Sequence, residues 1–142
     1  MGLYAVTMVG IVLISENSEA FEMLKTVQRL LGKPKGIVAV KLKPGDTIIR
    51  MRKQLQDGIQ KVSHKKGVLL LTHFYGSTQC NVCLEFVHKG VVELVSGFNL
   101  PMLVKLLTLH KTVPLKKLVP FIAQYGRTHI YHVQSKKMRV CY

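Results

Sequence analysis

Short apolar runs alternate with longer segments of helical periodicity along this chain, and this alternation constrains the fold most. Apolar runs of strand length occupy residues 4–14, 37–42, 68–72 and 91–95. Between them, segments such as 18–31 repeat apolar side chains every three or four residues, as one face of a helix requires. The pattern is typical of a parallel sheet wrapped by helices. We therefore expect an α/β fold, doubly wound and mostly parallel, with helices on both faces of the sheet.

The predicted helices have recognisable starts and stops. Ser18 is a suitable N-cap, and Gly32 and Pro34 end the first helical pattern. Pro120 falls inside the last helix, Leu115 to Tyr125, where we expect a kink or a break. The other helices are expected from the turn at 44–46 to about 64, from 79 or 80 to about 87, and from 101 onward.

The chain after the last helix is expected to form one more strand, Thr128 to Val133, and then a basic, partly apolar extension, 135–142. A strand in this place can lie at a sheet edge or pair with a second subunit. We accordingly divide the chain into a domain of residues 1–134 and a C-terminal extension of residues 135–142.

Length and composition indicate one packed domain. The chain has 142 residues, 48% of them hydrophobic and 20% charged, which excludes a disordered tail. The longest apolar stretch, Leu3 to Ile14, is about a dozen residues, too short to cross a bilayer. It also lacks the basic start and the cleavage site of a secretion signal. Three cysteines without an export signal suggest a reducing compartment, so we expect a cytoplasmic protein.

The formal net charge of +14 suits an anionic partner such as nucleic acid, an acidic protein or a phosphorylated ligand. The charge does not choose among these partners. Lysines and arginines are scattered, and they are not interleaved with aromatic residues as a platform for single-stranded nucleic acid would be. We regard most of them as solvated helix faces and loop ends and do not expect nucleic-acid binding. A non-enzymatic binding module with a basic surface remains the alternative function.

Two strand ends are the expected place for chemistry, because open parallel sheets bind ligands outside the carboxyl ends of their strands. Ser15-Glu16-Asn17 follows the first strand, and residues 72–78 follow the third. In the second loop, Gly76, Ser77 and Thr78 combine a permissive glycine with two hydroxyls at a helix start. Such a loop can hold a phosphate on backbone amides. A purely structural turn is an equally open interpretation.

His73 and Glu16 stand at these two strand ends. A carboxylate can hold an imidazole in one tautomer and stabilise its cation, so the pair, if close, could support nucleophilic or acid–base chemistry. A plain hydrogen-bonding role for His73 stays open beside this.

Cys80 and Cys83 form a Cys-x-x-Cys pair near a predicted helix start, where the helix dipole can lower the pKa of a thiol. Redox chemistry is one interpretation, and two small apolar residues packed on one helical turn is the other. A metal site would need two further ligands, for which Cys141 and His110 are only distant candidates. We expect neither a metal nor a cofactor.

Several blocks of the sequence together resemble the enzyme IIA domain of the mannose-family bacterial sugar phosphotransferase system. They are residues 10–15, 68–72, 76–82 and 95–103, with the turn at 43–46, and the resemblance covers about residues 7–125. It implies a phosphoryl carrier that accepts phosphate from the phosphocarrier protein HPr and passes it to the IIB component beside a membrane permease. It also implies a homodimer in which a C-terminal strand, here Thr128 to Val133, crosses to the partner.

The resemblance places the phosphoacceptor histidine of the family at position 16 and its partner aspartate at position 73. This chain has Glu16 and His73 there, and Asn17 where the family usually has glycine. The histidine and the carboxylate are thus exchanged. Whether the chain is a phosphotransferase is left open by this exchange.

Three interpretations follow. In the first, the domain binds partners or regulates without carrying phosphate. In the second, His73 accepts the phosphoryl group, Glu16 orients it, and Gly76, Ser77 and Thr78 hold the phosphoryl oxygens. In the third, the pair is only a satisfied hydrogen bond. We favour the interpretations without transfer, because moving the acceptor to another loop displaces its nitrogen from the in-line position. The deciding observation is whether Glu16 reaches the His73 ring.

Overall fold

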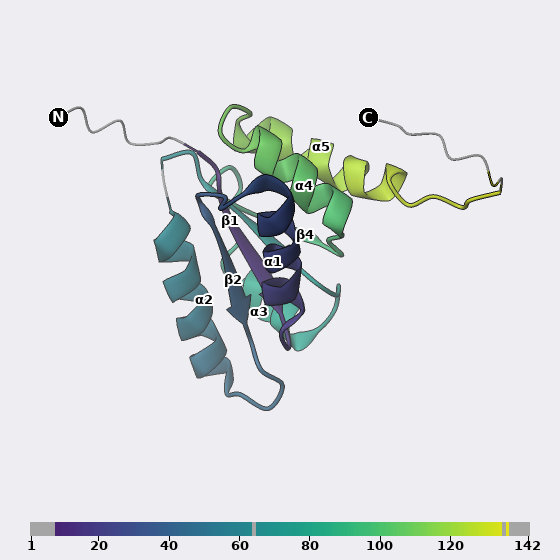
Figure 1. Cartoon of the computed structure of the whole chain (residues 1–142). Helices are drawn as coiled ribbons and strands as arrows, with labels where there is room; N and C mark the ends of the chain where they lie inside the picture. The colour runs from purple at the N-terminus through teal and green to yellow at the C-terminus, as the bar shows by residue number, and fades with distance from the viewer. Residues whose placement is uncertain (1–7, 64, 135, 137–142) are drawn as a thin grey trace.

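A computed structural model describes residues 8–63, 65–134 and 136 (Figure 1). In this part of the chain a parallel four-stranded sheet has the order β2-β1-β3-β4. Its strands are β1 (Gly10–Ser15), β2 (Ile37–Lys41), β3 (Val68–Thr72) and β4 (Val92–Ser96). The helices are α1 (Glu19–Leu31), α2 (Ile48–Val62), α3 (Thr78–Leu84), α4 (Leu100–Leu109) and α5 (Leu115–Thr128). The predicted α/β class and parallel sheet are confirmed.

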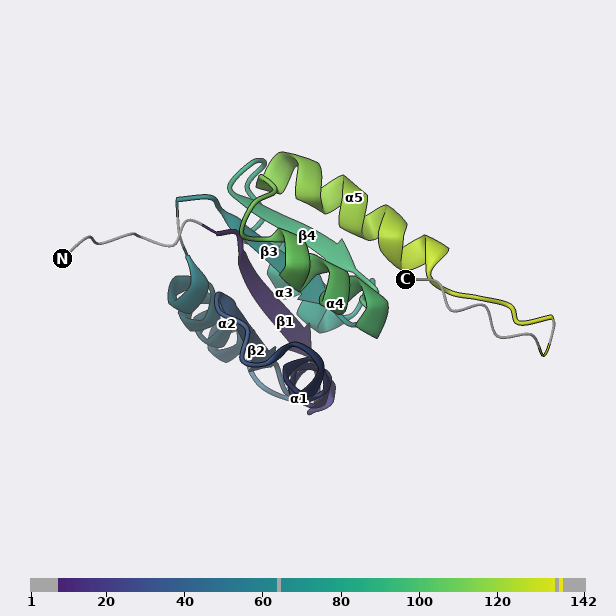
Figure 2. The same ribbon diagram turned by 45° about the horizontal axis from the view of Figure 1, so that its top comes forward.

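Helices cover both faces of the sheet, as the buried central strands require (Figure 2). Ile11 and Leu13 of β1 pack into a core shared with α1, α4 and α5. Val12 and Ile14, which point the other way, pack into a core shared with α2 and α3. Because all four side chains are fully buried, β1 reads in the sequence as an unbroken apolar run.

Close packing of α2 on the sheet depends on Gly58. A Cβ atom at this position would lie 2.6 Å from Cγ2 of Val40, closer than real Cβ contacts come. The glycine therefore lets the helix backbone approach β2 directly.

The last helix is longer than predicted. We expected Pro120 to kink or break it, and the helix is not broken: it continues through Pro120 to Thr128. Leu118 and Ile122 on either side of the proline are fully buried in the core, and this packing holds both halves of the helix in place. Pro120 itself is exposed, so the carbonyl that loses its amide donor can be hydrated.

The predicted strand Thr128 to Val133 does not form within the single chain. Thr128 is the last residue of α5, and its hydroxyl donates to the carbonyl oxygens of Gln124 and Tyr125, both at 3.2 Å. Residues 130–134 are exposed and pair with no strand in the described part of the chain. This segment contains β-branched and aromatic residues, which favour strands. The packed helix before it nevertheless extends to Thr128, the first residue of the predicted strand. A crossing to a second subunit stays a prediction.

Three other boundaries differ slightly from expectation. The first apolar run begins its strand only at Gly10, with residues 1–7 outside the described part of the chain. α3 begins at Thr78, one residue earlier than expected, and ends at Leu84, short of the predicted Val87. Of the extension 135–142, only Lys136 is described.

His110 fastens the start of β1 at the opposite, amino-terminal end of the sheet. Its backbone carbonyl accepts a hydrogen bond from the Val9 N–H (2.9 Å), and its Nδ1 donates to the Val9 carbonyl (3.0 Å). The side chain is almost completely buried.

Candidate functional site

The carboxyl ends of β1, β3 and β4 meet at one edge of the molecule. In the strand register Ile14 lies opposite Thr72, and Thr72 lies opposite Ser96. The hydroxyls of Thr72 and Ser96 are joined by a 2.8 Å hydrogen bond. The loops that follow these strands therefore gather at the place predicted from strand order, and we call this place the carboxyl edge.

Ser15 shapes the first loop of the carboxyl edge. Its buried hydroxyl donates to the Asn17 carbonyl (2.9 Å) and accepts from the Ala20 N–H (3.0 Å). Ser18 occupies the N-cap position of α1 as predicted, but its side chain makes no capping bond. Ser15 supplies a hydroxyl acceptor at the helix start instead, which the sequence spacing did not indicate.

Glu16 and His73 lie in the loops that follow β1 and β3. No hydrogen bond or ion pair joins them, although both belong to the described part of the chain. Glu16 is partly buried, while His73 is exposed and its ring lies against Phe98, with centroids 5.8 Å apart. In this arrangement Glu16 does not orient the imidazole.

Glu19, in the first turn of α1, is the carboxylate whose pKa is affected by the charge of His73. Its Oε2 accepts from the Asn17 N–H (3.0 Å). The pKa of the Glu19 carboxyl is lowered, first by its own backbone N–H, then by the Asn17 N–H, with the charge of His73 acting in the same direction. Sequence reasoning missed this residue, because an acidic residue in a first helical turn is ordinary and gave no separate signal.

The second loop is built as a helix start. Ser77 caps α3, accepting from the Cys80 N–H (3.1 Å) and donating to the Phe74 carbonyl (2.9 Å). Gly76 has a φ of 82°, which glycine adopts without strain, and both it and Thr78 are exposed. Of the three predicted phosphate-binding residues, Ser77 thus already uses its hydroxyl in the turn.

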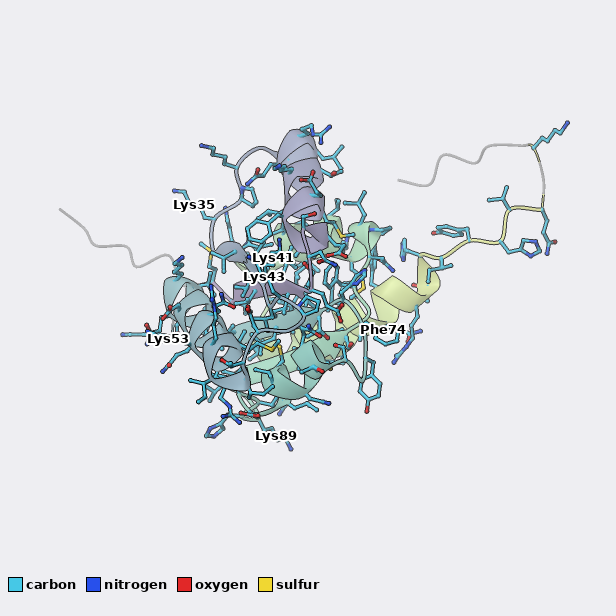
Figure 3. The ribbon with its side chains drawn as sticks, turned by 90° about the horizontal axis from the view of Figure 1, so that it is seen from below. Lys35, Lys41, Lys43, Lys53, Phe74 and Lys89 are labelled. Atoms are coloured by element: carbon cyan, nitrogen blue, oxygen red, sulfur yellow. The ribbon has the colours of Figure 1, made fainter. Side chains whose placement is uncertain are left out.

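Two aromatic side chains of this loop project into solvent. Phe74 is 67% exposed and Tyr75 is 78% exposed. Figure 3, which views the molecule from below Figure 1, shows Phe74 at the side of the carboxyl edge and Lys41 and Lys43 nearer its middle. Large exposed rings beside a loop are typical of a surface that contacts a partner. The sequence contained both residues, but it did not reveal their exposure.

The cysteine pair is part of the core beneath this loop. Cys80 and Cys83 are buried free thiols on α3. Burial raises the pKa of the Cys83 thiol to about 12, with a smaller contribution from Cys80. Because the thiolate is the reactive form, this environment supports the packing interpretation over redox chemistry.

No group of three or more histidine, cysteine or acidic side chains in residues 8–63, 65–134 and 136 is arranged to hold a metal ion. His110, a distant candidate ligand, is instead engaged with Val9. Cys141 lies outside the described residues.

The family model described as "PTS system fructose IIA component" (EIIA-man) matches residues 10–123. The chain belongs to this IIA family. The mannose-specific EIIAB component of Escherichia coli K12 is 27% identical over 130 residues, which cover 90% of this chain. The fructose-specific EIIA component of Bacillus subtilis is 20% identical over 113 residues, covering 79% of this chain and 77% of that protein.

Solved structures repeat the IIA fold. The mannose/sorbose-specific IIA subunit from Enterococcus faecalis superimposes with a TM-score of 0.80 at 21% identity, covering 94% of this chain and all of that one. A IIA protein associated with the fucose utilization operon of Streptococcus pneumoniae has a TM-score of 0.75 at 23% identity, covering 88% and 93%. The resemblance seen in the sequence is thereby confirmed at the level of family and fold.

The IIA chain spans only 40% of the length of the E. coli EIIAB relative. No helix within the described residues is long and apolar enough to cross a membrane. Membership of the family accounts for the fold of the chain. The chemistry of the carboxyl edge depends on the side chains that this chain has there.

Proposed function

We propose that this IIA domain is a component of the phosphoenolpyruvate-dependent sugar phosphotransferase system that binds HPr or a IIB component at its carboxyl edge without carrying phosphate on residue 16. The observation that carries the proposal is that Glu16 and His73 share no hydrogen bond or ion pair in the described part of the chain. A glutamate cannot form the phosphoramidate of a histidine, and an acyl phosphate is far more labile. The domain then acts as a binding or regulatory member of the system.

Partner binding at this edge is supported by its exposed surface. Phe74 and Tyr75 offer apolar area that a partner can bury, and Lys41 and Lys43, at and just after the end of β2, form no ion pair with any residue that the structure describes. The proposal includes cytoplasmic work beside a membrane permease.

The alternative within the same function is that His73 accepts the phosphoryl group, with Gly76, Ser77 and Thr78 binding its oxygens. Its support is weaker: Ser77 already donates within its own turn, and Glu16 does not hold the ring. In-line transfer also requires the acceptor nitrogen to face the donor, and His73 rests against Phe98.

One experiment tests the phosphoryl question. The protein is incubated with phosphoenolpyruvate, enzyme I and HPr, and acid-labile phosphohistidine is measured. We expect no label on the parent chain. Label that disappears in His73→Ala would establish His73 as the acceptor and refute our interpretation. Binding of HPr and of IIB is measured in parallel by calorimetry, and failure of both to bind would refute the assignment to this system.

Two further parts of the proposal concern assembly. The domain is taken as residues 1–134, followed by the extension 135–142. A homodimer is proposed to form at β4, whose outer edge pairs with no other strand in the described residues beyond a bridge between Val92 and His88, and which borders a groove of about 430 Å³ beside α5. Light scattering tests the dimer, and a monomeric mass at micromolar concentration would contradict it.

A further inference from the structure

β2 is an edge strand of the sheet, and among the described residues it pairs only with β1. The carbonyl of Gly36 and the N–H of Leu42, directly before and after β2, form hydrogen bonds with the backbone of β1 (2.8 and 3.0 Å). Even-numbered residues of this segment thus direct their backbone groups toward β1. Alternation along the strand directs the N–H and C=O groups of Ile37, Ala39 and Lys41 outward, where a further strand could pair with them.

A groove of about 250 Å³ lies beside this outer edge, lined by β2, α1 and α2. β2 lies between these two helices (Figure 2). On the side of α1 the groove is lined by Phe21, which is 41% exposed, and on the side of α2 by Gln54 and Gly58. The buried Oε1 atom of Gln54 has no hydrogen-bond partner among the described residues. Ala39 and Lys41 are only partly buried, so the edge is accessible from this groove.

The chain on either side of β2 is strongly cationic. Between Glu22 and Asp46 the sequence has six lysines and arginines and no aspartate or glutamate. Lys25 pairs with Glu22, and the other five cations form no ion pair with any residue that the structure describes. These five are Arg29, Lys33, Lys35, Lys41 and Lys43. The edge strand therefore lies within a stretch of uncompensated positive charge.

Cations stand at both ends of the groove. Lys35 is exposed just before β2, and Lys41 ends the strand. Lys61, in the last turn of α2, also lines the groove. Asp57 lines it too, but its carboxylate is paired with Lys53 (3.3 Å). A ligand of this edge should accordingly carry negative charge toward both of its ends.

We propose that an extended, acidic segment of a partner protein binds along the outer edge of β2 as an additional strand. The outward backbone groups of β2 pair with the segment, its apolar side chains contact Phe21, and its carboxylates are attracted by the lysines. The inference goes beyond the proposed function. It uses the opposite edge of the sheet from the proposed homodimer, and it uses no residue of the loops that contain Glu16 and His73.

A second copy of this chain fits the same edge poorly. Pairing of two β2 edges about a two-fold axis would bring the two sets of cations against each other. Lysines on an edge strand hinder such pairing between like edges. The charge that excludes a second copy selects an acidic segment.

Fluorescence anisotropy measures binding of the full chain to a labelled peptide, Asp-Glu-Val-Thr-Val-Glu-Asp. We expect saturable binding that weakens as NaCl rises. The same peptide with its three central amides N-methylated keeps its charge but cannot pair as a strand, and it should bind at least about tenfold more weakly. In nuclear magnetic resonance spectra, the amide signals of Ile37, Ala39 and Lys41 should shift when the unmodified peptide is added.

Two variants test the edge itself. Ala39→Pro removes an outward N–H and leaves the bonds to β1 in place, so it should weaken peptide binding at least about tenfold. K35E/K61E should weaken it about tenfold, because each reversal replaces an attraction by a repulsion. The matched control K116E/K117E changes the net charge equally on exposed lysines of α5, and it should lose less than about threefold. Circular dichroism verifies that each variant is folded.

Three results would overturn the inference. The first is absence of binding to the acidic peptide, which would leave the lysines as protection of the edge alone. The second is equal binding of the N-methylated peptide, and the third is an equal loss in K116E/K117E and K35E/K61E, since attraction would then follow total charge. Self-association that disappears in Ala39→Pro would assign the edge to a second copy and overturn it too. Binding of HPr and IIB is measured separately, and its failure would refute the proposed function without changing this result.

Discussion

At the carboxyl edge, the buried hydroxyl of Ser15 holds the loop between β1 and α1 in place. The same loop contains Glu16, the residue on which the proposed function depends. Ser15 bonds both the Asn17 carbonyl and the Ala20 N–H, which sets the path of the chain from β1 into α1. The Asn17 N–H in turn holds the Glu19 carboxylate. Glu16 takes no part in this set of bonds among the described residues, so its identity is free to change without disturbing the loop.

Ser15→Ala should lower the free energy of unfolding by about 1 to 2 kcal/mol, because the buried Ala20 N–H loses its acceptor. Urea denaturation measures the change. Ser18→Ala is the matched control, since the Ser18 side chain makes no capping bond, and it should fall within about 0.5 kcal/mol of the parent. A larger cost for Ser18 than for Ser15 would contradict our description of the helix start.

Restoring the residues that the family has at positions 16 and 73 tests whether the carboxyl edge retains the geometry for phosphoryl transfer. Glu16→His with His73→Asp should produce acid-labile phosphohistidine with phosphoenolpyruvate, enzyme I and HPr, from none in the parent. Glu22→His, on the exposed side of α1, serves as the control and should stay unlabelled. If the double variant binds HPr and remains unlabelled, more of the site has changed than these two positions.

Among the helices, α5 shows how tertiary packing overrides a local breaker. Pro120 removes one backbone hydrogen bond inside the helix, and the buried side chains of Leu118 and Ile122 hold the two turns nonetheless. The helix consequently carries a local cost that a substitution can relieve.

Pro120→Ala should raise the free energy of unfolding on the order of 1 to 3 kcal/mol, because it restores the missing donor and removes the ring clash. Pro101→Ala, in the first turn of α4, should give no such gain, since a proline there replaces an N–H that has no partner in the helix. Thermal unfolding of both variants checks the contrast. Equal effects at the two positions would show that Pro120 is not strained by its place in α5.

The elements that could be predicted are those whose local and tertiary preferences agree. β3 was predicted with its exact residues, since an apolar run of five between Gly67 and His73 has no competing pattern. The segment after Tyr125 has β-forming residues but follows a packed helix, which continues as far as Thr128. That the loops after β1 and β3 meet at one edge followed from the expected parallel sheet. The missing hydrogen bond between Glu16 and His73 and the exposure of Phe74 could not be predicted, because loop side chains take their directions from contacts that spacing does not encode.

Across the whole molecule, the two ends of the described domain are tied together by His110 and Val9, which are 101 residues apart. Burial lowers the pKa of the His110 imidazole below its ordinary value of 6.5. The Val9 carbonyl offsets part of this shift, and the charge of Lys111 adds to it. The imidazole therefore stays neutral in the folded protein at pH values where the unfolded chain binds a proton.

Folding stability should consequently be full above about pH 6.5 and fall as the pH drops below it, with a slope of at most about 1.4 kcal/mol per pH unit from this group. Denaturation curves at several pH values measure the slope. His110→Gln should flatten it between pH 6.5 and the folded pKa, although the variant is less stable throughout. The exposed His88→Gln is the control, and a slope that survives His110→Gln and vanishes in His88→Gln would contradict this assignment.

The sheet order β2-β1-β3-β4 also has a consequence for synthesis. β1 is a central strand, yet it leaves the ribosome before either neighbour, and its second neighbour ends only at Thr72. Until β3 has been made, the side chains of Val12, Leu13 and Ile14 cannot be fully buried. A nascent chain shorter than about half the domain therefore exposes an apolar strand that is prone to aggregate. Ribosome pausing or premature termination before β3 should therefore yield insoluble fragments that engage chaperones, whereas release after α5 yields a chain able to close its own core.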